Sequence, residues 1–120
     1  MASLRKVIAD YDVESNSLCV QVVGKRSSFS VDNGDLVIDF DSEKAVVGVE
    51  FLGASRILSI ISKKEITKDM LRNIKKCDLV SKRSGNTLVV RFVIELSQNT
   101  VITNSITLPL ISQEKLVAIA

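Results

Sequence analysis

The sequence predicts an α+β fold, mainly an antiparallel β-sheet meander with two short central helices. Short apolar segments with strand-like alternation, separated by polar turns, fill most of the 120 residues. Apolar side chains recur at helical spacing only in the middle of the chain. Strands and helices do not alternate regularly, as they would in a parallel sheet. Together these observations favour strands, then two helices, then strands again.

The N-terminal half predicts five strands. They are expected at residues 5–11, 18–23, 29–31, 36–40 and 45–52. Short polar turns between consecutive strands indicate antiparallel pairing. Asn33-Gly34 predicts a hairpin, because both central positions of its turn need a positive φ. Gly48 interrupts an apolar strand, where a β-bulge or close backbone packing is expected.

Two short helices are expected next. Ser55 is placed to cap the first. Thr67 is placed to cap the second, with Ile66 and Leu71 spaced as a hydrophobic staple across that cap. Apolar residues follow one stripe of the second helix and basic residues the other side as far as Lys76, so the helix is predicted to extend to that residue.

The last third returns to strands, which are expected at residues 78–82, 87–96 and 100–108. The middle segment alternates cleanly, and five apolar side chains share one face: Leu88, Val90, Phe92, Ile94 and Leu96. Pro109 either ends the last strand or marks it as an edge. The apolar segment 116–120 is expected to pair as an edge strand or to cover a hydrophobic patch.

Composition bounds the class of protein. With 46% apolar and 25% charged residues, the chain is expected to fold as one domain over residues 1–120. Residues 5–61 form its strand meander and short helix, and residues 62–120 its helix followed by antiparallel strands. No apolar run approaches the roughly 20 residues that cross a bilayer, and no secretory signal pattern is present. We therefore expect a cytoplasmic protein without membrane contact.

The absence of histidine excludes the serine–histidine and cysteine–histidine hydrolases and removes the commonest transition-metal ligand. Cys19 and Cys77 lie in apolar surroundings and are expected to be free, buried thiols, although the sequence leaves a disulfide between them open. The five glycines are isolated, so no phosphate-binding loop is predicted.

Several short motifs of the first half resemble a prokaryotic family known as domain of unknown function 2283. The motifs are Tyr11-Asp12-x-Glu14, Ser17-Leu18, Val-Ile-Asp-Phe-Asp at 37–41 and Val-Val-Gly-Val-Glu-Phe-Leu-Gly-Ala-Ser at 46–55. The resemblance covers roughly residues 5–61. It implies a compact antiparallel sheet with a helix, no established activity, and an antitoxin-like partner-binding role as a conceivable function. Cys19 departs from the family's usual tyrosine, and Gly53 from its usual acidic residue.

One acidic cluster is a candidate metal site. Asp39, Asp41 and Glu43 would share one face of an extended chain, which suits Mg²⁺ or Ca²⁺. A solvated hairpin turn is the favoured interpretation, because no calcium-loop motif is present. We therefore expect no metal-binding residue.

A second acidic cluster holds Asp10, Asp12 and Glu14. Asp12 is expected to accept hydrogen bonds from the backbone of its own turn. Tyr11 and Glu50 are candidates to meet across the sheet. A catalytic carboxylate pair would need burial that the sequence does not show, so no catalytic residue is predicted.

A basic segment, residues 63–83, holds half of the chain's sixteen Lys and Arg residues. We expect Lys68, Arg72, Lys75 and Lys76 to form one face of the second helix and to be the candidate contacts for nucleic acid or another partner. Aromatic residues make up only 4% of the chain, too few for a base-stacking platform.

These observations favour a non-catalytic interaction or structural module that forms a homo-oligomer, most simply a dimer. Residues 1–60 carry six basic and nine acidic side chains, a net charge of −3, and residues 61–120 carry ten and five, a net charge of +5. Opposite charge on the two halves is compatible with contact between subunits. We expect no enzyme activity and no cofactor, and another protein is a further candidate partner. The alternative is a nucleic-acid-binding or antitoxin-like regulatory protein that uses the basic segment.

Overall fold

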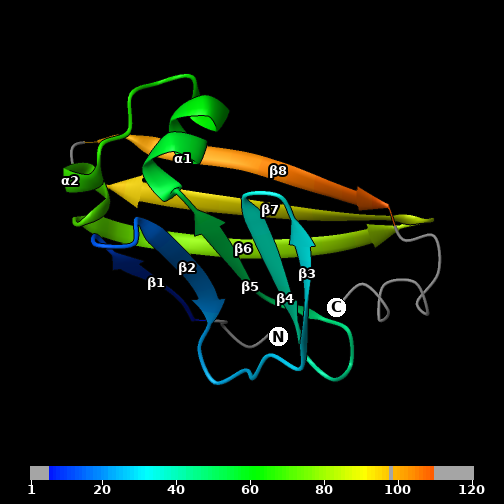
Figure 1. Ribbon diagram of the computed structural model, residues 1–120. Helices are drawn as coiled ribbons and strands as arrows, with labels where there is room; N and C mark the ends of the chain where they lie inside the picture. Colours follow the sequence, from blue (N-terminus) through cyan, green and yellow to red (C-terminus); the bar gives the residue numbers. More distant parts are fainter. Residues whose placement is uncertain (1–5, 98, 110–120) are drawn as a thin grey trace.

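The computed structural model describes residues 6–97 and 99–109 (Figure 1). Its elements are β1 Val7–Asp12, β2 Ser17–Val22, β3 Phe29–Asn33, β4 Leu36–Phe40, β5 Val46–Leu52, α1 Ala54–Ser62, α2 Lys68–Leu71, β6 Ile74–Ser84, β7 Thr87–Leu96 and β8 Val101–Pro109. Every strand pair among these residues is antiparallel. The predicted α+β class with mainly antiparallel sheet is therefore confirmed. The segment 116–120 lies outside the described residues.

The strands form two sheets. The first has the order β1-β2-β5-β4-β3 and the second the order β6-β7-β8. In Figure 1 the long strands of the second sheet run across behind the shorter strands of the first. The inner faces share one buried apolar cluster, in which Phe51 packs edge-on against Phe92 with 5.0 Å between the ring centroids. All five apolar side chains predicted to share a face of residues 87–96 lie in this core.

Helix α1 begins differently from the prediction. Its N-cap is Gly53, at φ 64°, and this residue makes no side-chain capping bond, so the prediction that Ser55 caps the helix is wrong. Asn16, in the turn between β1 and β2, binds the helix start instead. Its backbone carbonyl accepts from Ala54 N at 2.7 Å, and its side-chain Oδ1 accepts from Ser55 N at 3.2 Å. The cap was missed because it comes from a distant part of the sequence.

Helix α2 is much shorter than predicted. Thr67 caps it as expected, with its hydroxyl accepting from Met70 N at 3.1 Å. The helix ends at Leu71, and β6 begins at Ile74, so the predicted extension of the helix to Lys76 is wrong. The reason is tertiary, because β6 pairs with β7 along its full length and this ladder outweighs local helix propensity.

A hairpin turn and an edge strand complete the comparison with the predicted fold. Asn33 pairs with Leu36, so the β3–β4 loop is Gly34-Asp35, and of these two only Gly34 has a positive φ. The hairpin is confirmed, but its turn lies one residue further along than predicted and has glycine first. Pro109 ends β8, which is an edge strand, as expected.

Candidate functional site

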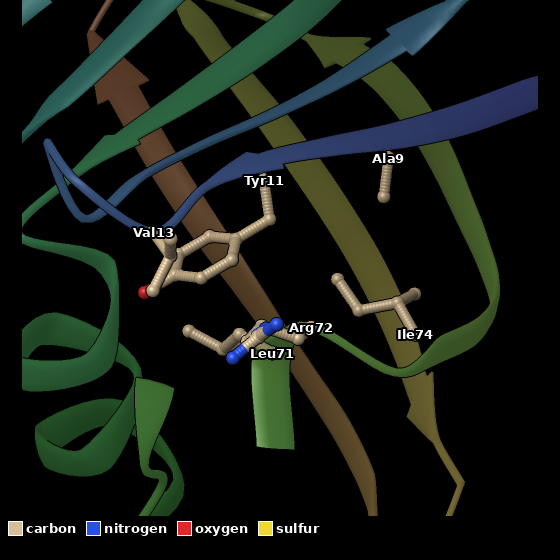
Figure 2. A pocket seen from close by; sticks show the side chains of 6 residues that line it. All are labelled: Ala9, Tyr11, Val13, Leu71, Arg72 and Ile74. Atoms are coloured by element: carbon tan, nitrogen blue, oxygen red, sulfur yellow. The ribbon is translucent and has the colours of Figure 1, made fainter. Parts of the chain in front are cut away.

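A groove lies between strand β1 and the start of β6. One cavity, of about 280 Å³, is lined by Ala9, Tyr11, Val13, Leu71, Arg72 and Ile74. Figure 2 shows Ala9 pointing from β1 toward Ile74, and the Tyr11 ring turned toward Val13. A second cavity, of about 320 Å³, shares Ala9 and Ile74 and adds residues of both strands, Lys75 and Lys76 among them. Because the cavities share two residues, we treat them as one β1–β6 groove.

The free edge of β1 borders this groove. Among the described strands β1 pairs with β2 alone, and Val23 N donates to Lys6 O at 2.8 Å. Hydrogen-bonded pairs alternate along an antiparallel ladder, so the backbone groups of Val7, Ala9 and Tyr11 point away from β2. The Cys77 thiol on β6 donates to Val7 O at 3.6 Å, which confirms that this edge faces β6.

Tyr11 forms a fixed wall of the groove. Its hydroxyl donates to Asn16 Oδ1 at 2.7 Å, and Asn16 Nδ2 donates to Ser55 Oγ at 2.9 Å. Burial, and then the charge of Asp12, raise the pKa of Tyr11. The phenol therefore stays neutral and joins the β1–β2 turn to helix α1.

The structure divides the predicted basic face. Lys68 lies in α2, Arg72 at its C-cap, and Lys75 and Lys76 in β6, so these four residues do not form a single cationic helix face. Arg72, Lys75 and Lys76 line the β1–β6 groove, and Lys68 does not. Lys75 Nζ also lies 3.7 Å from Glu95 Oε2. Three of the four predicted contact residues thus come together at the groove, on a surface that the sequence did not predict.

An acidic pair lies on the outer face of the five-stranded sheet. Asp39 is only 7% exposed and accepts from Ser30 Oγ at 2.5 Å. Burial, then a hydrogen bond with Asp39 and the charge of Asp39, raise the pKa of Glu50 to about 7. Below about pH 7 Glu50 is therefore mostly protonated, and its proton lies in the hydrogen bond between the two carboxyl groups. The backbone at Gly48 leaves room for this pair, since an added Cβ would lie 3.1 Å from Asp39 Oδ2.

Both cysteines are free, as predicted, but they are partly rather than fully buried. Burial, followed by the charges of Glu50, Asp39 and Asp10, raises the pKa of Cys19 to about 11. Burial and then the charge of Asp78 raise the pKa of Cys77. Both thiols are therefore protonated at neutral pH and are weak nucleophiles.

In both predicted acidic clusters, a carboxylate accepts hydrogen bonds from the backbone of its own turn. Asp41 accepts from Glu43 N and Ala45 N, both at 2.9 Å, and does not join Asp39. Asp12 accepts from Glu14 N at 3.1 Å, as expected. In residues 6–97 and 99–109, no three His, Cys, Asp or Glu side chains are grouped so that they could hold a metal ion. Among the same residues, no helix is long and apolar enough to cross a membrane.

The predicted meeting of Tyr11 with Glu50 is wrong. Tyr11 is opposite Leu18 and points inward, whereas Glu50 is opposite Cys19 and points outward. The acidic pair was missed because it depends on the pairing of β4 with β5, in which Asp39 is opposite Gly48 and Glu50 is opposite Val37, so that the two carboxyl groups are diagonal neighbours on one face. Gly48 was the available signal: of the two alternatives predicted for it, close packing is confirmed, and the register irregularity lies beside it, between the Asp39 and Phe40 pairings.

The second sheet carries a further surface, which we call the β6–β8 outer face. It holds the side chains directed away from the core, among them Val80, Arg91, Val93, Glu95 and Val101. Val80 is 52% exposed and Val101 46% exposed. Helix α1 packs on the inner side, where Asn104 Nδ2 donates to Ile61 O at 3.4 Å. In the described part of the chain, the outer face is therefore left uncovered by either helix (Figure 1).

Comparison with known proteins finds a family match in the first half of the chain. The chain is 38% identical over 77 residues to an uncharacterized protein of Methanocaldococcus jannaschii, a match that covers 64% of this chain. The chain spans 62% of the length of that relative. No solved structure matches the chain. Residues 9–55 match the family described as Protein of unknown function (DUF2283), which confirms the resemblance of the N-terminal half to that family.

Proposed function

We propose that the chain is a small cytoplasmic, non-catalytic interaction module that forms a homodimer through the β6–β8 outer face. The observation that carries the proposal is the set of valines on an uncovered sheet face, with Val80 and Val101 about half exposed. Exposed apolar side chains gathered on one face are typical of protein contact sites. The two free thiols are compatible with a reducing compartment.

The charges along β7 fit a two-fold dimer. On the outer face Arg91, Val93 and Glu95 follow one another at alternate positions. A two-fold axis through Val93, lying in the interface and perpendicular to β7, makes the two β7 strands antiparallel. That arrangement places Arg91 of each copy opposite Glu95 of the other, so the face is complementary to itself.

The size of the face predicts a weak dimer. Three strands of about nine residues give a surface of about 30 Å by roughly 14 Å. Such a footprint belongs to the lower end of specific interfaces. Asp78 is opposite Val93 in the ladder and lies close to the proposed axis, where its copy adds repulsion. We therefore expect association in the micromolar range or weaker.

Sedimentation velocity across protein concentration tests the dimer. We expect Val93→Lys to abolish concentration-dependent association, and Ile60→Lys, at an exposed apolar position on α1, to leave it unchanged. Asp78→Asn is expected to tighten the dimer. Arg91→Glu and Glu95→Arg should each weaken it, and the double exchange should restore it. A wild-type protein that stays monomeric at about 1 mM would contradict the proposal.

A further inference from the structure

We propose that the β1–β6 groove binds an extended, acidic segment of a partner protein, which adds a strand to the free edge of β1. This inference does not depend on the dimer, although the groove borders the dimer face at Lys76, which is opposite Glu95 in the ladder. Unpaired strand edges bind extended peptides through main-chain hydrogen bonds, with pockets for alternate side chains.

The backbone of β1 supplies the hydrogen bonds. Ala9 and Tyr11 direct their N–H and C=O groups away from β2, toward the groove. In the part of the chain that the structure describes, no other strand pairs with this edge. The carbonyl of Val7 already accepts from the Cys77 thiol. An incoming strand therefore finds two residues with donors and acceptors in the alternation that a peptide backbone matches.

The walls of the groove select small or branched apolar side chains. Ala9 contributes little side-chain volume on the β1 side, and the partly buried Ile74 forms the opposite wall (Figure 2). Leu71 closes the floor and is 1% exposed. In an added strand every second side chain would face this apolar wall, and the others would project to solvent.

The charge around the groove selects acidic residues at the projecting positions. Lys6, Arg72, Lys75 and Lys76 line its two cavities, and none of the described lining residues is acidic. Lys75 forms an ion pair with Glu95, which neutralises part of its charge. Asp10 and Asp12 belong to β1 as well, but they alternate with Ala9 and Tyr11 and so project from the other face of the strand. The groove is thus cationic on an apolar floor.

A peptide fits these features better than a nucleic acid does. Among the described residues, Tyr11 is the only aromatic side chain that lines the groove, and its hydroxyl is held by Asn16, so bases find no stacking platform there. Alternating backbone donors and acceptors match a β-strand, whereas phosphates accept hydrogen bonds only. We therefore expect a peptide to bind this groove more tightly than a single-stranded oligonucleotide does.

The test uses a fluorescent, end-blocked peptide of seven alternating Glu and Val residues, with binding followed by anisotropy. We expect saturable binding, with amide shifts at Ala9 and Tyr11 in NMR spectra. Combined Arg72→Ala and Lys76→Ala should weaken binding about tenfold. Lys82→Ala, which removes a lysine at the far end of β6 from Lys76, should change the dissociation constant of the peptide less than about twofold.

Two control probes separate strand addition from simple charge attraction. A peptide with Lys in place of Glu should not bind. The Glu-Val peptide N-methylated at alternate residues should also fail, because it lacks the backbone donors. Equal binding of the methylated and unmethylated peptides would overturn the proposal. Tighter binding of a twelve-residue thymidine oligonucleotide through Arg72 and Lys76 would overturn it in favour of a nucleic-acid site.

Discussion

The two sheets are built by different means. The five-stranded sheet, which holds most of the family-matched residues, depends on individual residues in special positions. Asn16 binds the start of α1, and Gly48 makes room for the Asp39–Glu50 pair. The three-stranded sheet follows plain alternation of apolar and polar side chains. The difference indicates that the family motifs mainly stabilise the fold, while the two surfaces that we propose for partners lie on the second sheet and at its border with the first.

The largest effect is expected where the two sheets share one core, because a common core makes them unfold together. Phe92 on β7 packs edge-on against Phe51 on β5 in the shared core, and both are fully buried. We expect Phe92→Ala to lower the free energy of unfolding by about 3–5 kcal/mol. Chemical denaturation should still show one transition by circular dichroism and by tyrosine fluorescence. Two separate transitions would show that the sheets are independent.

The next largest effect is expected at Asn16. Its side chain binds Tyr11, Ser55 Oγ and Ser55 N, and its backbone has a φ of 55°. Asn16→Ala should cost about 2–3 kcal/mol, because it removes the cap and places alanine in the left-handed region. Asn16→Gly keeps the positive φ without strain, so its loss of stability measures the side-chain hydrogen bonds alone. If denaturant melts gave both variants wild-type stability, Asn16 would not stabilise the junction between the β1–β2 turn and α1.

A substitution at Gly48 tests how closely Asp39 packs against the backbone of β5. An added Cβ would lie 3.1 Å from Asp39 Oδ2 and 3.4 Å from Val20 O. We expect Gly48→Ala to destabilise the protein by about 1–2 kcal/mol. In an Asp39→Ala background the same change should cost roughly half as much, because the nearest atom is gone. Thermal melts of the four proteins in this cycle measure the coupling, and strict additivity would contradict the close contact.

The smallest effect is expected from the titration of Glu50 on the five-stranded sheet. The pKa of Glu50 rises from its ordinary 4.5 to about 7, so between these values the folded state holds a proton that the unfolded state lacks. Stability should therefore fall as pH rises from about 4.5 to 7. Glu50→Gln, which stays neutral, should exceed the wild type above pH 7 by on the order of 1 kcal/mol, since partial exposure reduces the effect.

The control for this titration is Glu43→Gln, in an exposed turn. It should reproduce the wild-type pH profile of stability. Melting temperatures measured from pH 4.5 to 8.5 make the comparison, and a Glu50→Gln protein that follows the same profile as the wild type would rule out the shared proton.

Local pattern predicted most strands, because alternation and turn residues are encoded within a few positions. The prediction for residues 87–96 matches β7, and the cap at Thr67 follows from its immediate neighbours. The failures are mostly long-range. Residues 74–76 have helical apolar spacing but form the start of β6, because they pair with β7. Asn16 caps α1 from the turn between β1 and β2, which is distant in the sequence. The groove depends on which strand edges face each other, and that order is not written in any single segment.

The most direct test of the dimer surface is a dilution series followed by amide NMR spectra of the wild-type protein. We expect concentration-dependent shifts at Val80, Arg91, Val93 and Val101, and none at Asp39 or Glu50. Shifts confined to the Asp39–Glu50 face, or none up to about 1 mM, would contradict the assignment of self-association to the β6–β8 outer face.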